Sequence, residues 1–96
     1  MPSILPQMFN LPVSESKTYY EDLSSGKNAT INVLNLSPNP VDLVVTRANA
    51  DTSTYTISGF NSRSLSVDQL LSVSLSSSED GPAFGGILIT TLDDIV

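Results

Sequence analysis

The chain has 96 residues, enough for one domain and too few for two. It carries four Lys and Arg against ten Asp and Glu, and the resulting net charge of −6 disfavours binding to nucleic acid. It contains no Cys and no His, which excludes disulfides, thiolate metal sites and catalysis by a Ser-His-Asp or Cys-His arrangement.

Residues 1–13 are rich in apolar side chains, carry no charge and contain three prolines, so we predict an extended arm and not a helix. In an extended chain the apolar residues at odd positions point to one face. They are Leu5, Phe9, Leu11 and Val13. We therefore divide the chain into an N-terminal connector arm, residues 1–13, and a β-sandwich domain, residues 14–96. The predicted assembly interface consists of Ile4, Leu5, Met8, Phe9, Leu11 and Val13.

The rest of the chain consists of short apolar-alternating segments separated by turn residues. This pattern predicts an all-β fold, a single jelly-roll-like β-sandwich preceded by the arm as an extended donor strand. In residues 71–76, for example, large apolar residues alternate with serines, which is typical of a strand with one face in water. The predicted strands are 17–22, 29–36, 41–48, 54–60, 63–67, 70–76 and 87–92.

Two of these segments carry more specific predictions. Ala29, Ile31 and Val33 share one parity, whereas the next apolar residues, Leu34 and Leu36, have the other parity, which predicts a bulge or a change of sheet. Residues 41–45 have one polar member and predict a central strand covered on both faces.

Residues 67–69 predict a break between two strands, and residues 81–86 predict a turn before the last strand.

The sequence offers little for catalysis. Its acid pairs are sequence neighbours, and on a strand neighbours point to opposite faces, so we interpret them as solvated surface. The pair Asp93-Asp94 has weak calcium binding as an alternative interpretation. The glycines of residues 81–86 are not followed by the Lys of a phosphate-binding loop. We therefore predict no enzymatic activity, no cofactor and no metal site.

Targeting and membrane signals are also missing. The N-terminus lacks the basic region and the continuous apolar run of a secretory signal. No segment approaches the roughly 18 apolar residues of a membrane span. We expect synthesis without a signal peptide and no membrane insertion.

The arm has two interpretations. It is either an ordinary first strand that folds back on its own domain, or a strand donated to a neighbouring copy, where it extends a sheet edge. Donor and acceptor surfaces differ, so the second interpretation predicts a head-to-tail homopolymer, which is a ring if it closes and a filament if it does not.

The arm, the Ser/Thr-rich domain, residues 29–36 (ATINVLNL) and residues 85–92 (GGILITTL) together resemble the endospore appendage (Ena) fibre subunits of bacilli. The resemblance implies an eight-stranded jelly roll that donates its N-terminal connector to neighbours along a pilus on the spore surface, an extracellular fibre of the spore or cell surface. Some family members carry connector cysteines that lock the fibre covalently. This chain has none, so strand insertion alone would hold its fibre. The expected partners are further copies of the chain, with anchor and tip proteins as additional candidates.

Two alternatives stay open at this point. The same features admit a phage virion structural protein, a tail or capsid decoration subunit. They also admit a carbohydrate-binding β-sandwich module whose shelf would be formed by aromatic residues, although in a small β domain such residues more often fill the core. These residues are Tyr19, Tyr20, Tyr55, Phe60 and Phe84.

Overall fold

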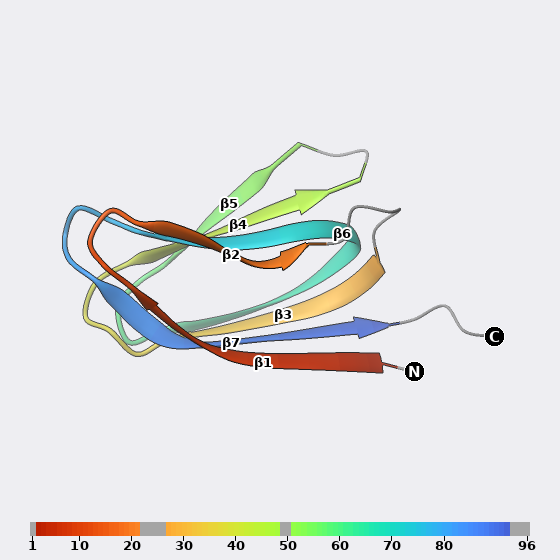
Figure 1. Cartoon of the computed structure of the whole chain (residues 1–96), viewed down its shortest axis with the longest axis horizontal. Helices are drawn as coiled ribbons and strands as arrows, with labels where there is room; N and C mark the ends of the chain where they lie inside the picture. Colours follow the sequence, from red (N-terminus) through yellow and green to blue (C-terminus); the bar gives the residue numbers. More distant parts are fainter. Residues whose placement is uncertain (1, 22–26, 49–50, 93–96) are drawn as a thin grey trace.

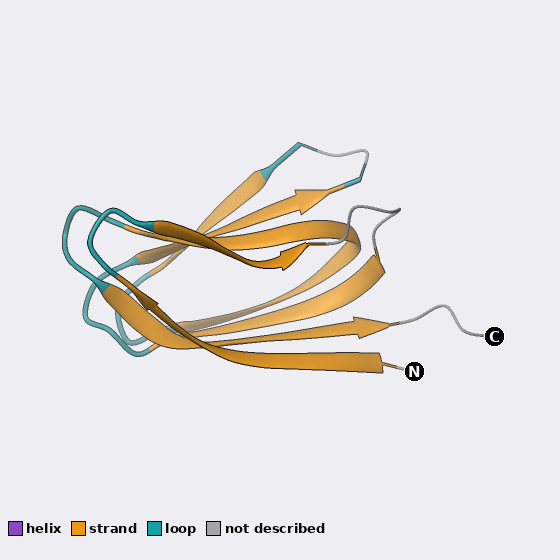
Figure 2. Cartoon of the chain, in the orientation of Figure 1, coloured by secondary structure: helices purple, strands orange, loops and turns teal. Residues whose placement is uncertain are grey.

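The computed structural model describes residues 2–21, 27–48 and 51–92, with side chains described outside 2–6, 27 and 92. Strands joined by turns and loops make up the secondary structure of these residues (Figures 1 and 2), and no helix long and apolar enough to cross a membrane occurs among them. The strands are β1 (Pro2–Leu11), β2 (Ser16–Glu21), β3 (Lys27–Asn35), β4 (Val41–Arg47), β5 (Ser53–Ile57), β6 (Ser62–Ser77) and β7 (Ala83–Leu92).

The strands pair antiparallel in the order β1-β7-β3-β6-β4-β5, and β2 also pairs with β6. Two layers result (Figure 1) because β6 contributes to both of them. Residues 62–67 of β6 pair with β3 and complete the layer β1-β7-β3-β6. The C-terminal part of β6 pairs with β4 and β2 and completes the layer β2-β6-β4-β5. The fold is therefore the all-β, jelly-roll-like sandwich that the sequence predicts.

The predicted break at residues 67–69 is a bend within one continuous strand and not a turn between two strands. Gln69 adopts a left-handed backbone conformation with φ of 53°, and its carbonyl accepts a hydrogen bond from Ala48 N at 2.9 Å. The register of β6 against β3 and against β4 shifts at this point. The bend directs the chain from one layer into the other, so the two predicted strands are the two halves of β6.

The prediction of a bulge or a change of sheet within residues 29–36 is wrong. The pairing of β3 with β7 is regular from Asn28 to Asn35, and burial alternates without interruption. The positions that follow Val33 on the inner side are polar, Asn35 and Ser37, and both are fully buried. The two leucines of this segment therefore lie on the outside of the sandwich.

A hydrogen-bond network explains why these two polar residues are buried. Asn35 Nδ2 donates to the carbonyls of Asn39 at 2.8 Å and of Ile57 and Ser58 at 3.2 Å. Ser37 Oγ donates to Asn35 Oδ1 at 2.6 Å. Buried polar groups cost little when they are satisfied in this way, so the register that places them inside is stable.

The predicted central strand also differs from the structure. β4 lies between β5 and β6, but only the side chains of Val41, Leu43 and Val45 are buried, whereas Asp42 and Val44 on the other face are half-buried. β6, with three neighbours, occupies the central place. The core is filled by inward side chains of both layers. They are Phe9, Leu11, Tyr19, Ala29, Ile31, Val33, Val41, Leu43, Val45, Ile57, Val67, Leu70, Val73, Leu75, Ala83, Ile87 and Ile89.

Candidate assembly surface

The predicted arm forms β1 in the single chain. It pairs with β7 at ten positions, from Pro2 opposite Leu92 to Leu11 opposite Ala83. This is the arrangement of the first interpretation given above, a strand that folds back on its own domain. Donation of the strand to another copy stays a prediction.

The predicted interface residues have different environments in this arrangement. Phe9 and Leu11 are buried in the chain's own core, whereas Met8 is 75% exposed on the opposite side of β1. Val13 follows the strand and is half-exposed. Ile4 and Leu5 belong to β1, but their side chains lie outside the description.

The turn at residues 12–15 links β1 to β2 and is tied to the end of β6. Ser14, with φ of 54°, donates its amide to Ser78 O at 3.1 Å, and Ser77 N donates to Glu15 O at 2.8 Å. The buried Ser77 hydroxyl donates to Pro12 O and accepts from Glu15 N. The turn is therefore held by specific hydrogen bonds to the end of β6.

The outer face of the layer β1-β7-β3 with residues 62–67 of β6 is unusual in composition. Its strand segments, as the structure describes them, contain no Asp or Glu, although the chain has ten such residues. We call it the acid-free layer. Large apolar side chains are exposed on it or at its edge. They are Met8, Leu34, Leu36 and Phe84.

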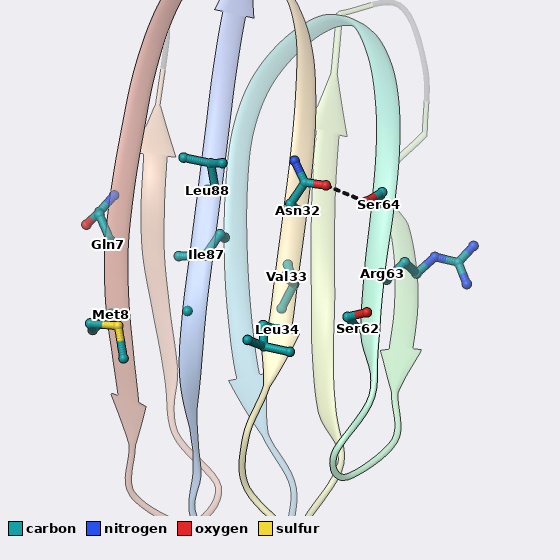
Figure 3. Close-up of a pocket in the computed structure, with 11 residues that line it drawn as sticks. Gln7, Met8, Asn32, Val33, Leu34, Ser62, Arg63, Ser64, Ile87 and Leu88 are labelled. Carbon is teal, nitrogen blue, oxygen red and sulfur yellow. Dashed lines mark hydrogen bonds between the residues drawn. The ribbon is translucent and has the colours of Figure 1, made fainter.

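A glycine opens a hollow in this face. Gly86 on β7 lies between Met8 on β1 and Leu34 on β3. Because glycine has no side chain, a gap separates the Met8 and Leu34 side chains. A Cβ atom placed at Gly86 would have its nearest neighbours, Gln7 O and Met8 Sδ, at 3.9 Å. The open hollow has a volume of about 510 Å³. We call it the Gly86 hollow (Figure 3).

The rim of the Gly86 hollow is mixed in chemistry. Leu88 lies beside it on β7, and Asn32 and Ser64, which are hydrogen-bonded to each other, lie on β3 and β6 (Figure 3). Arg63 is the charged residue among those described around the hollow, and its guanidinium lies 4.7 Å from the Tyr55 ring. Beside these polar groups, the hollow presents the apolar side chains of Met8, Leu34 and Leu88, which suit contact with an apolar group.

The other outer face belongs to β2, β4, β5 and residues 70–77 of β6, and we call this the hydroxyl layer. Its outward positions are mainly Ser and Thr, with Asp42 bonded to Thr56 Oγ1 at 2.7 Å. Thr18 and Ser74 share a hydrogen bond of 3.0 Å, and Ser16 bonds Ser76. This face is suited to contact with water.

Neither face assembles a recognisable catalytic or metal site among the described residues. No group of three or more Asp or Glu side chains comes together there, and Asp93-Asp94 lie outside the described residues. The aromatic residues considered for a sugar shelf do not share one face, because Tyr19 is in the core and Tyr20 and Tyr55 pack against it. Burial raises the pKa of Tyr19 above its usual value, as expected for a desolvated phenol.

Comparison with known proteins gives a likeness of fold. No family model and no curated protein matches the sequence. A solved structure from Bacillus endospore appendages, which form disulfide-linked pili, matches with a TM-score of 0.68 and 16% identity over 96% of this chain and 89% of that chain.

Two further structures match less well. The cupin domain of Drosophila melanogaster CENP-C has a TM-score of 0.54 and 7% identity over 88% of this chain and 57% of that chain. The fatty-acid-bound ToxT from Vibrio cholerae has a TM-score of 0.50 and 15% identity over 95% of this chain and 30% of that chain. At these identities the likeness concerns the fold: this chain is similar in fold to a subunit of an appendage pilus, but it lacks the cysteines that a disulfide link requires.

Proposed function

We propose that this chain is a structural subunit that polymerises head to tail with copies of itself into a non-covalent fibre of a spore or cell surface. The observation that carries the proposal is the likeness to the Bacillus appendage structure, which extends over 96% of this chain and 89% of that one. Because this sequence has no cysteine, contacts between folded surfaces or exchanged strands must hold the fibre together.

The proposed joint is the exchange of β1, with residues 1–13 as the connector arm and residues 14–96 as the accepting domain. Within one chain, β1 pairs with β7 at ten positions. The same ladder forms between two copies when β1 of one copy lies on β7 of the next, with Phe9 and Leu11 in the same core positions. Burial of each of these two side chains stabilises the joint by roughly 1.5–3 kcal/mol relative to leaving it exposed.

The turn at residues 12–15 decides between the closed and the exchanged state, since nearly all other contacts are common to both. It is short, and it contains Pro12 and the left-handed Ser14. An open chain of exchanged copies leaves one free β1 and one unfilled acceptor at its two ends. Anchor and tip proteins are the partners that would occupy these ends.

Single cysteines on β1 and β7 test the exchange. Asn10 and Phe84 are opposite each other in the ladder and both are exposed. Opposite residues in antiparallel strands have Cα atoms about 4.5–5.5 Å apart, within the reach of a disulfide. When Asn10→Cys chains and Phe84→Cys chains are mixed, assembled and oxidised, we expect fibres by electron microscopy and a disulfide between positions 10 and 84 by mass spectrometry.

The matched control replaces Phe84→Cys by Thr90→Cys, which lies six residues further along β7, about 20 Å away. This pair should give no disulfide. Fibres without the link between positions 10 and 84, together with closure of the Asn10→Cys/Phe84→Cys double variant within one chain, would refute exchange but not assembly. An absence of fibres at every concentration tested would refute the proposed function itself.

A further inference from the structure

Phe60 is a second apolar feature that the chain's own core does not use. It lies in the turn between β5 and β6, is 72% exposed and has φ of 60°. A bulky residue in this left-handed region is an outlier, with a backbone cost of order 1–3 kcal/mol. Backbone strain of this kind clusters at functional sites.

The turn that carries Phe60 is held in place. The Phe60 amide donates to Ser37 O at 3.0 Å, and Asn61 N donates to Ser58 O at 3.2 Å. Gly59 is so close to Pro38 that a Cβ atom there would lie 2.3 Å from the Pro38 carbonyl oxygen. The ring is therefore presented to solvent by a fixed backbone, which lowers the entropic cost of binding through it.

The Gly86 hollow has room for this ring and apolar side chains to contact it. Its volume of about 510 Å³ exceeds the roughly 150 Å³ of an apolar cavity that holds benzene. Its sides are formed by Met8 and Leu34, which are 75% and 47% exposed in the single chain. Phe60 of the same chain does not fill the hollow, because its own side chain is largely exposed.

Charge indicates which kind of partner fits the hollow. Each copy carries a net charge of −6, so copies repel one another wherever carboxylates face each other. The strand segments around the hollow contain no carboxylate, and neither does the turn with Phe60 (Ser58, Gly59, Phe60, Asn61). Contact between these two surfaces therefore brings no carboxylates of these segments face to face.

We propose that the Gly86 hollow receives Phe60 of a neighbouring copy, as a second contact beside the β1 joint. This proposal rests on the proposed self-association. The turn with Phe60 lies two residues before Ser62 in the chain, and Ser62 lines the hollow, so the contact pairs Phe60 of one copy with the hollow of another copy. A buried aromatic anchor in a central pocket is the usual form of an energetically dominant contact.

Two variants remove the two halves of the contact. Phe60→Asn removes the ring, and Asn tolerates the left-handed backbone, so the fold is kept. Gly86→Leu fills the hollow from a position where a Cβ atom makes only ordinary van der Waals contacts. We expect each variant to raise the critical concentration for fibre formation at least about tenfold. Phe84→Asn is the matched control, since Phe84 is exposed but does not line the hollow, and it should shift this concentration less than about twofold.

Photo-crosslinking locates the contact independently of fibre yield. With p-benzoylphenylalanine at position 60, we expect interchain adducts on Met8, Leu34 or Leu88. Fibres whose adducts lie elsewhere would overturn the Phe60 contact and leave the proposed function intact. Adducts at the hollow in oligomers that never become fibres would support the contact and refute the fibre.

An acyl chain is the other occupant that an apolar hollow could take. In that case dodecanoate binds the wild-type protein, Gly86→Leu abolishes this binding, and Phe60→Asn leaves assembly unchanged. That combination would overturn the proposal.

Discussion

The two outer faces of the sandwich come from strands with the same alternation but differ in their exposed apolar side chains. On the acid-free layer, outward positions include Met8 and Leu34, and Gly86 leaves a hollow between them. On the hydroxyl layer, the outward positions are mainly Ser and Thr, which keep their hydrogen bonds with water or with each other. Removing the first face from water gains free energy, whereas removing the second gains little. Assembly is therefore expected on the acid-free layer.

The largest expected effect separates the two sides of β1. Phe9 is 1% exposed and fills the core, so Phe9→Ala should lower the free energy of unfolding by about 3–5 kcal/mol in urea denaturation. Met8→Ala, on the outer side, should change it by less than about 0.5 kcal/mol and weaken fibre formation instead. Equal destabilisation by both substitutions would show that the two sides of β1 are assigned wrongly.

The next effect concerns the network that keeps Leu34 and Leu36 on the outside. Asn35→Ala leaves the carbonyls of Asn39, Ile57 and Ser58 without this donor, which should cost about 3 kcal/mol, the upper end for unsatisfied buried groups. Asn32→Ala, at a half-buried outward position of the same strand, is the control and should cost less than about 1 kcal/mol. Thermal and urea unfolding measure both, and a small effect of Asn35→Ala would mean that water replaces the amide.

A carboxylate placed on each face compares the faces directly. Leu34→Asp puts a negative charge on the acid-free layer and should raise the critical concentration for fibres at least about tenfold, with little effect on folding. Val44→Asp adds the same charge at a half-buried outward position of the hydroxyl layer and should shift the critical concentration less than about twofold. Sedimentation of fibres over a dilution series measures both. The reverse order would place the assembly contact on the hydroxyl layer.

The strands and the sandwich could be predicted because alternation with period two and turn residues are local signals. Three features could not be predicted in this way. The bend at Gln69 depends on pairing with two layers at once, and the inward position of Asn35 depends on carbonyls more than 20 residues away in sequence. The Gly86 hollow exists because a glycine on β7 stands between side chains of β1 and β3, a relation that only register shows.

The sequence identified the apolar arm but left its partner open. The common parity of Phe9 and Leu11 correctly predicts that both side chains point to one buried side. Parity does not show whether they are buried in the core of their own chain or of a neighbouring copy. Met8 belongs to the predicted interface because it is apolar. The structure separates it from Phe9 by placing it on the outer face, beside the Gly86 hollow.

The smallest expected effect tests the inert character of the hydroxyl layer. Ser74 shares a hydrogen bond of 3.0 Å with Thr18 in a solvent-exposed pair. In Ser74→Ala, water can replace the lost partner of Thr18, so the free energy of unfolding should change by less than about 0.5 kcal/mol and the critical concentration should stay the same. Urea unfolding and fibre sedimentation measure these two quantities. A loss of fibres at unchanged stability would mean that copies meet through hydrogen-bonded hydroxyls, because a hydroxyl group that stays in water in the fibre cannot influence assembly.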